Sequence, residues 1–165
     1  MNPGDLGGRL ESLLAGDLAA WQGLPDIVVH DLEALFGDPV ESSSVRVGAY
    51  SAQRLEFRAG KGRRTLVAFA RDERVFMVEV LPPPDRNALA GLPEPTAVLP
   101  QEIAVEGAYA HEVLHAERGL LLTMAQRFEE PEPRSLVRCR GIRPLVDRRA
   151  LGPELYMPLE TDVKW

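Results

Sequence analysis

Between Pro39 and the triple proline at residues 82–84, apolar and polar residues alternate, and this pattern limits the possible folds of the chain more than any other feature. Successive side chains of a β-strand point to opposite faces, so an apolar residue at every second position is typical of a strand with one buried face. Turn-like sequences at 60–62 and 71–74 separate the runs, and the prolines end the last one. The pattern predicts a meander of short antiparallel strands. Its alternating apolar positions are Val45, Val47, Leu55, Phe57, Leu66, Ala68, Val75 and Met77.

Two helices are expected before these strands. Residues 5–21 carry leucines and Trp21 at helical spacing, which predicts an amphipathic helix. A second helix opens at Pro25 and is ended by Gly37, because glycine readily adopts the left-handed conformation that terminates a helix. The buried stripe predicted for this second helix is Ile27, Val28, Leu32, Leu35 and Phe36.

Two stretches of the first half of the chain match two stretches of the second half, in the same order. DLEALFGDP at 31–39 matches DRNALAGLP at 85–93, and GAYSAQRLEFRAG at 48–60 matches GAYAHEVLHAERG at 107–119. The matches include glycines and prolines, whose roles in turns are specific. They indicate that one structural unit occurs twice.

Together these patterns predict an α+β fold in a single domain of 165 residues. We expect the N-terminal helix to be followed by two tandem helix-plus-antiparallel-sheet repeats. The first repeat spans about 26–81 and the second about 85–143, and residues 144–165 form a C-terminal tail.

The sequence HEVLH at residues 111–115 matches the H-E-x-x-H motif of zinc metallopeptidases. On a helix, His111 and His115 would share one face and could bind a zinc ion, while Glu112 would activate the bound water. A small zinc peptidase is therefore one hypothesis for the function, with zinc as its cofactor.

The internal match argues for a strand at this motif, because the counterpart of HEVLH lies in the predicted meander. Gly119 also comes only four residues after His115 and would cut a helix short. On a strand the two histidines would lie about 13 Å apart, four residues at about 3.3 Å each. No single ion bridges that distance, so we expect no catalytic or metal-binding residue in the motif.

The stretches LEALFGDP at 32–39 and NALAGLP at 87–93 resemble the helix ends of the β-lactamase-inhibitor-protein and small outer-membrane-assembly lipoprotein group. Units of that group begin with a helix that ends in a Gly-x-Pro-like turn and continue into a small sheet. The Gly-Met-Thr helix start, the cysteines and the lipoprotein signal of the group are missing here. The resemblance implies a non-catalytic binding protein, and it carries over no functional residue.

Composition limits the class of partner. The formal net charge is −6, which argues against nucleic-acid and anionic-membrane binding. No apolar run approaches the roughly 20 residues that span a bilayer. The one cysteine, Cys139, fits a reducing cytoplasm and is expected to be buried and structural rather than a nucleophile.

We therefore expect a non-catalytic protein-interaction or structural module with a protein partner. Aromatic residues dominate binding surfaces, so the candidate contact residues are Tyr50, Tyr109, Tyr156 and Trp165. A further hypothesis is a subunit of a larger homo- or hetero-oligomer that docks through helix 5–21 and the end of the tail, YMPLETDVKW at 156–165.

Overall fold

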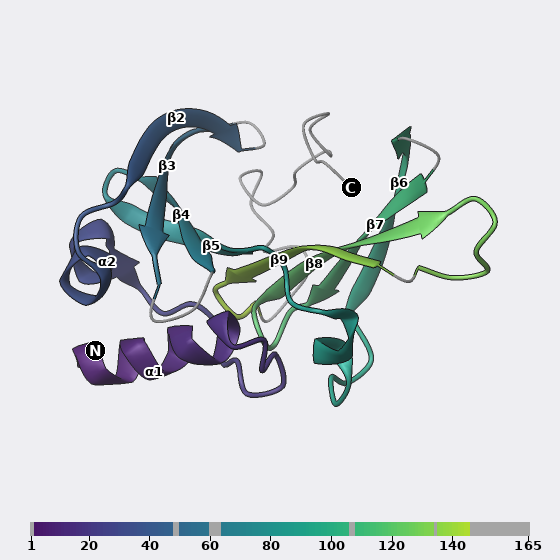
Figure 1. Cartoon of the computed structure of the whole chain (residues 1–165), viewed down its shortest axis with the longest axis horizontal. Coiled ribbons are helices and arrows are strands. Elements are labelled where there is room, and N and C mark those ends of the chain that lie inside the picture. Colours follow the sequence, from purple (N-terminus) through teal and green to yellow (C-terminus); the bar gives the residue numbers. More distant parts are fainter. Residues whose placement is uncertain (1, 48–49, 60–63, 106–107, 134, 146–165) are drawn as a thin grey trace.

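The computed structural model describes residues 2–47, 50–59, 64–105, 108–133 and 135–145 of the chain. Most of the strands lie in the two halves of one antiparallel sheet (Figure 1). The first half is a meander of β2 (Glu41–Val47), β3 (Tyr50–Arg58), β4 (Thr65–Arg71) and β5 (Arg74–Leu81). The prediction of a meander of short antiparallel strands between Pro39 and the triple proline is confirmed.

The second half contains β6 (Ala97–Val105), β7 (Ala108–His115), β8 (Leu120–Arg127) and β9 (Ser135–Ile142). The order across the sheet is β2-β3-β4-β5-β9-β8-β7-β6, so the last strands of the two halves lie side by side at its centre. Three residue pairs join them: Met77 with Ile142, Val78 with Gly141, and Glu79 with Arg140. The two-residue strand β1 (Ile27–Val28) pairs with the start of β5.

The prediction of two tandem helix-plus-sheet repeats is wrong. The strands of both halves form one nine-stranded sheet, and only the first half has an α-helix before its strands. The second half has η1 (Arg86–Leu89), a 3-10 turn of four residues. Gly91, which has a φ of 85°, and Pro93 and Pro95 follow it closely and prevent a longer helix.

The helix predicted at residues 5–21 is shorter in the structure. Helix α1 (Pro3–Leu14) has an Asn2 side chain that accepts a hydrogen bond from the Gly4 amide, and it ends before Gly16, which has a φ of 77°. Helix α2 (Val29–Phe36) begins later than predicted, because Ile27 and Val28 pair with β5 as β1. Val28 is 39% exposed and so does not belong to the buried stripe.

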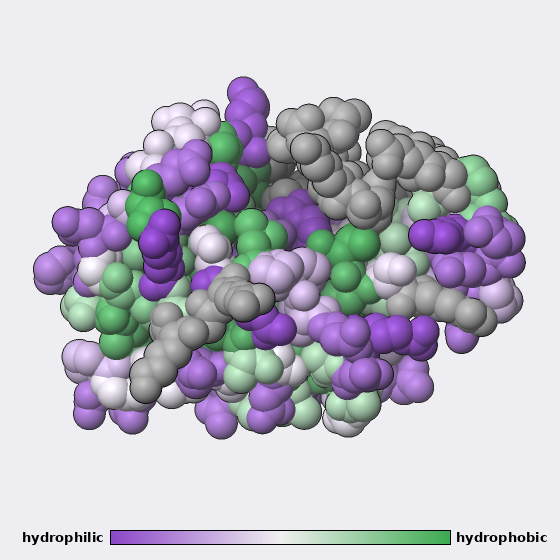
Figure 2. All heavy atoms as spheres, in the orientation of Figure 1, coloured by the Kyte–Doolittle hydropathy of each residue, from purple (hydrophilic) through white to green (hydrophobic). Residues whose placement is uncertain are grey.

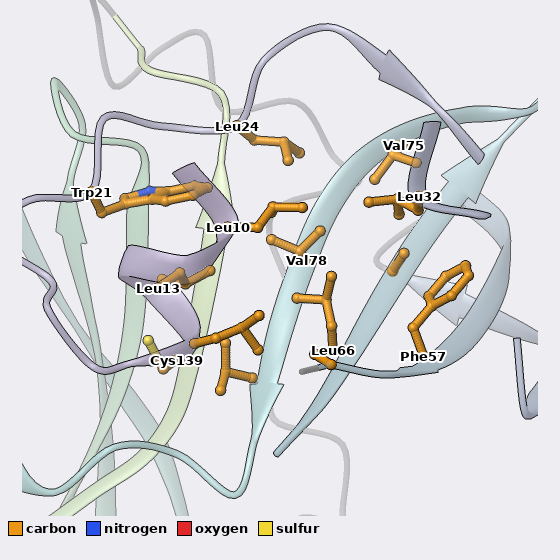
Figure 3. Close-up of a cluster of buried hydrophobic side chains, with 14 of the residues drawn as sticks. Leu10, Leu13, Trp21, Leu24, Leu32, Phe57, Leu66, Val75, Val78 and Cys139 are labelled. Atoms are coloured by element: carbon orange, nitrogen blue, oxygen red, sulfur yellow. The ribbon is translucent and has the colours of Figure 1, made fainter. Parts of the chain in front are cut away.

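Both helices pack on one face of the sheet, which we call the helix-side face (Figure 1). Leucines of α1 meet Trp21, Leu66 and Val78 in the core shown in Figure 3. Phe36 of α2 contacts Phe57 of β3 with a ring-centroid distance of 6.3 Å. The apolar stripe of α1 is thus buried inside the protein. The tail, the other part of the assembly hypothesis, lies outside the described residues.

The opposite face of the sheet carries a second buried cluster. Its members alternate along the strands with the residues of the helix-side core, as the pleat of a strand requires. They are Val47, Ala52, Val67, Phe69, Met77, Leu114, Ala116, Leu121 and Ile142. Both faces of the central strands are therefore buried.

Candidate functional site

The HEVLH sequence lies on strand β7, paired with β6 on one side and β8 on the other. The prediction of a strand here is confirmed. His111 and His115 project from the helix-side face, about 13 Å apart at about 3.3 Å per residue. Because zinc–nitrogen bonds are about 2.0–2.1 Å long, these histidines cannot share one zinc ion.

Glu112 projects from the opposite face and belongs to a buried polar network. Its Oε2 accepts a hydrogen bond from Arg140 Nη2 at 2.5 Å, and its Oε1 accepts one from Thr123 Oγ1 at 3.1 Å. Arg140 Nη2 also donates to Thr123 Oγ1 at 2.6 Å. Arg140 has no exposed surface, and burial lowers its pKa while the neighbouring Glu112 raises it. Glu112 is thus a structural counter-ion and is not placed to activate a water molecule.

A second ion pair extends this network toward the centre of the sheet. Arg138 donates from Nε and Nη2 to the two carboxylate oxygens of Glu79, at 2.8 and 2.9 Å. This two-bond geometry is the strong form of an arginine–carboxylate contact. Because β5 and β9 supply one partner each, the pair links the two halves of the sheet.

Within the described ranges, no group of three or more His, Cys, Asp or Glu side chains is placed to hold a metal ion. Glu130, in the turn after β8, accepts a hydrogen bond from the Arg127 amide at 2.9 Å. The third histidine, His30, lies 3.6 Å from Glu33 at the surface of α2. The three residues of the metallopeptidase hypothesis therefore lie on one strand, where the two histidines are too far apart to share an ion and Glu112 points to the opposite face.

Cys139 lies in the helix-side core and is buried. Burial is the main cause that raises the pKa of its thiol to about 12. The thiolate is the nucleophilic form of cysteine, so this residue is not a nucleophile at neutral pH.

The helix-side face of β7 and β8 is open where α1 and α2 do not reach it. Tyr109 is 45% exposed, and its ring meets that of Phe128 edge-on with a centroid distance of 4.8 Å. Phe128 is 55% exposed and Val98, on the neighbouring β6, is 49% exposed. Among the described residues these are three of the five large hydrophobic side chains with high exposure, and they share one face of one half.

A groove of about 630 Å³ lies on the same face, between β7–β8 and the segment of residues 86–95. Ligand-binding pockets of proteins have volumes of about 300–1,000 Å³ and mostly apolar walls. The apolar side chains at the centre of this groove are Leu89, Leu92, Val98, Val113, Leu122 and Met124. His111, His115 and Glu132 are its titratable residues.

A second cavity of about 610 Å³ adjoins the groove and is more polar. Pro93 and His115 line both cavities, so the two are neighbours, and together we call them the cleft. The polar end is lined by Glu94, Glu117 and Arg118. Arg118 is anchored there by a hydrogen bond from Nη1 to the Ala19 carbonyl.

His115, between the two cavities, is only 7% exposed, and its Nδ1 is a buried atom without a hydrogen-bond partner. A buried N–H without an acceptor costs more than a buried acceptor without a donor, so the neutral ring carries its proton on Nε2. Burial, followed by the nearby Arg118, lowers the pKa of His115 from its ordinary value of 6.5. His115 thus presents one neutral N–H group to the cleft.

His111 is oriented by hydrogen bonds along β8. Gln126 donates from Nε2 to the Glu130 carbonyl at 2.9 Å, so its Oε1 is the atom that faces His111 Nε2 at 3.0 Å. Because that oxygen can only accept, His111 Nε2 carries the proton. The two histidines of HEVLH are therefore fixed separately on the wall of the cleft.

The lowered pKa of His115 predicts that the protein loses stability in mild acid. Below about pH 6.5 the unfolded chain binds a proton at His115 before the folded protein does, so the free energy of unfolding falls as the pH falls toward the folded-state pKa. Above that pH the residue is neutral in both states and contributes no slope. We expect His115→Leu to remove the contribution of this residue to the fall in the free energy of unfolding at low pH. Urea unfolding at several values between about pH 8 and pH 5 measures that fall. Identical pH profiles for both proteins would contradict the prediction.

Of the four predicted contact residues, the structure describes the side chain of Tyr109 alone. Tyr50 lies in β3, but its side chain is not among those described, and Tyr156 and Trp165 lie outside the described residues. Sequence reasoning missed Phe128 and Val98. Phe128 had a signal in the sequence, because it is a large apolar residue at the start of the polar turn FEEPEP.

No helix of the described chain combines the length and the apolar character needed to cross a bilayer. Comparison of this chain with family models, with curated proteins and with solved structures gave no match in any of the three.

Proposed function

We propose that the protein is a non-catalytic protein-interaction module whose binding surface is the helix-side face of β6–β8. The observation that carries the proposal is the exposed apolar side chains of Val98, Tyr109 and Phe128 together with the mostly apolar groove on the same face of the sheet. Soluble monomers rarely leave contiguous apolar surface open to water without a use for it. In the view of Figure 2, hydrophilic and hydrophobic residues are interspersed over the surface.

Aromatic residues at the centre of a contact supply most of the binding energy of typical interfaces. Tyr109 and Phe128 are preorganised for this role, because each ring holds the other in an edge-on contact. The reduced, buried Cys139 is consistent with a cytoplasmic setting, which we include in the proposal.

Site-specific cross-linking tests this proposal. A photo-reactive amino acid in place of Phe128 is expected to capture a defined partner protein in cells that naturally make this chain. The matched control carries the same group in place of Val40, which is 56% exposed but belongs to the other half of the molecule. A Tyr109→Ser substitution should weaken capture at 128, and it should change the free energy of unfolding by less than about 1 kcal/mol because the residue is exposed. Equal labelling at both positions, or none, would contradict the proposal.

A further inference from the structure

The cleft indicates what kind of partner segment this surface accepts. Resting on the proposed function, we propose that its occupant is a segment of a partner protein with an apolar core and basic residues on both flanks.

The shape of the cleft favours a protein segment over a small molecule. The groove and the polar cavity adjoin at Pro93 and His115, and the exposed Val98 and the Tyr109–Phe128 pair lie on the same sheet face. An occupant that covers all of this surface must therefore be long. In the first half of the molecule, α2 covers the same face of the sheet with apolar side chains. The second half has only the four residues of η1 at the equivalent point of the chain, so the partner would supply the missing cover.

The two ends of the cleft are acidic. Glu94 and Glu117 are exposed at one end, and Glu132 is exposed at the other. Arg118 lies near the first two and keeps its positive charge while it donates to the Ala19 carbonyl, so one negative charge remains at this end. The chain as a whole has a formal net charge of −6, which adds to the attraction of a basic partner. Opposite charges at the rim of an interface select the partner and speed its association.

His115 gives the centre of the cleft one polar contact. Its Nδ1 is buried without a partner, and this leaves Nε2 as the nitrogen open to the cleft. A neutral N–H matches a main-chain carbonyl, which every protein segment carries. The apolar walls on either side would then bury the side chains that flank this carbonyl.

Binding of designed peptides, followed by fluorescence anisotropy with the full-length protein, tests the inference. One peptide has an apolar core of leucine and alanine with paired lysines at each end, and a second has paired glutamates instead. We expect the lysine peptide to bind at least about tenfold more tightly, and its affinity to fall as salt is added. A third peptide has the lysines distributed among the leucines, and it should bind more weakly than the first.

Charge reversal identifies the site of binding. In the triple variant E94K/E117K/E132K we expect the preference to change from the lysine to the glutamate peptide. The control is E41K, a single reversal on the exposed edge strand β2, which should leave the preference unchanged. His115→Ala should weaken binding about two- to tenfold, the effect of one hydrogen bond.

Three results would overturn the inference: equal binding of the lysine and glutamate peptides, a preference unchanged by the triple reversal, or self-association of the protein through the cleft in light scattering. None of these results decides the proposed function, which is tested by specific capture at position 128. Capture of a partner together with equal peptide binding would therefore refute the basic segment alone.

Discussion

Replacing Glu112 by alanine is expected to lower the free energy of unfolding by about 3–5 kcal/mol, the usual effect of removing one partner from a buried ion pair. The Arg140 guanidinium has no exposed surface, and its Nε and Nη1 already lack hydrogen-bond partners. Without Glu112 its charge would be left inside the protein with the Thr123 hydroxyl as a hydrogen-bond partner and the Glu79 carboxylate as a more distant counter-charge. Urea unfolding followed by circular dichroism measures the change.

Two controls show whether the loss comes from the uncompensated charge. The double variant Glu112→Leu with Arg140→Met removes both charges, and it should recover most of the stability because a buried ion pair and a well-packed apolar pair are often of similar stability. Glu56→Ala breaks the more exposed pair with Arg54 and should cost less than about 1 kcal/mol. A double variant as unstable as Glu112→Ala would contradict this account.

Replacing Gly119 by alanine is expected to destabilise the protein by about 4 kcal/mol, at the upper end of single substitutions. Gly119 has a φ of 63°, and an added Cβ would lie 2.1 Å from the Ile142 carbonyl oxygen. That carbonyl accepts a hydrogen bond from the Leu24 amide, while the Gly119 carbonyl accepts bonds from Ile142 and from Trp21 Nε1. The substitution thus disturbs three segments that meet at the end of β9.

Gly91→Ala is the matched control for backbone conformation. Gly91 has a φ of 85°, but an added Cβ would meet only the Ala19 methyl group at 3.9 Å, an ordinary contact. Its cost should be the backbone strain alone, about 1–2 kcal/mol. Thermal or urea unfolding of both variants measures the difference, and equal losses would show that the contact at Ile142 has no effect.

The strands of this fold were predictable from local patterns, because alternation is a property of neighbouring residues. The same reasoning predicted the turn at 71–74, where Asp72 and Glu73 both have positive φ values as a two-residue hairpin loop requires. It also predicted that HEVLH lies on a strand, since the match to the first half placed the motif at the position of β3.

The tertiary arrangement was not predictable in this way. Each of the stretches 48–60 and 107–119 contains a strand, β3 and β7, but their match could not indicate that the two meanders join through β5 and β9 into one sheet. A shift of one residue in strand register moves every side chain of the strand to the other face of the sheet. The contact of Glu112 with Arg140 therefore depends on how β8 is paired with β7 and with β9, which local patterns do not show. The match of DLEALFGDP to DRNALAGLP wrongly predicted a helix before the strands of the second half. The structure has only η1 there, and the groove beside β7 and β8 is open because that helix is missing.

The junction of β5 and β9 also has a consequence for biosynthesis. Within each meander, the paired strands are consecutive in the sequence and are joined by short loops. Met77 and Ile142, by contrast, pair although most of the second half of the chain lies between them in the sequence. A ribosome delivers β9 after all the other strands. Until then, the long edge of β5 beyond its two-residue pairing with β1 presents unpaired backbone groups, which other chains can join. During synthesis, β5 is therefore a site at which the nascent chain can pair wrongly, although it lies at the centre of the finished sheet. Pairing of β9 with β5 removes this site.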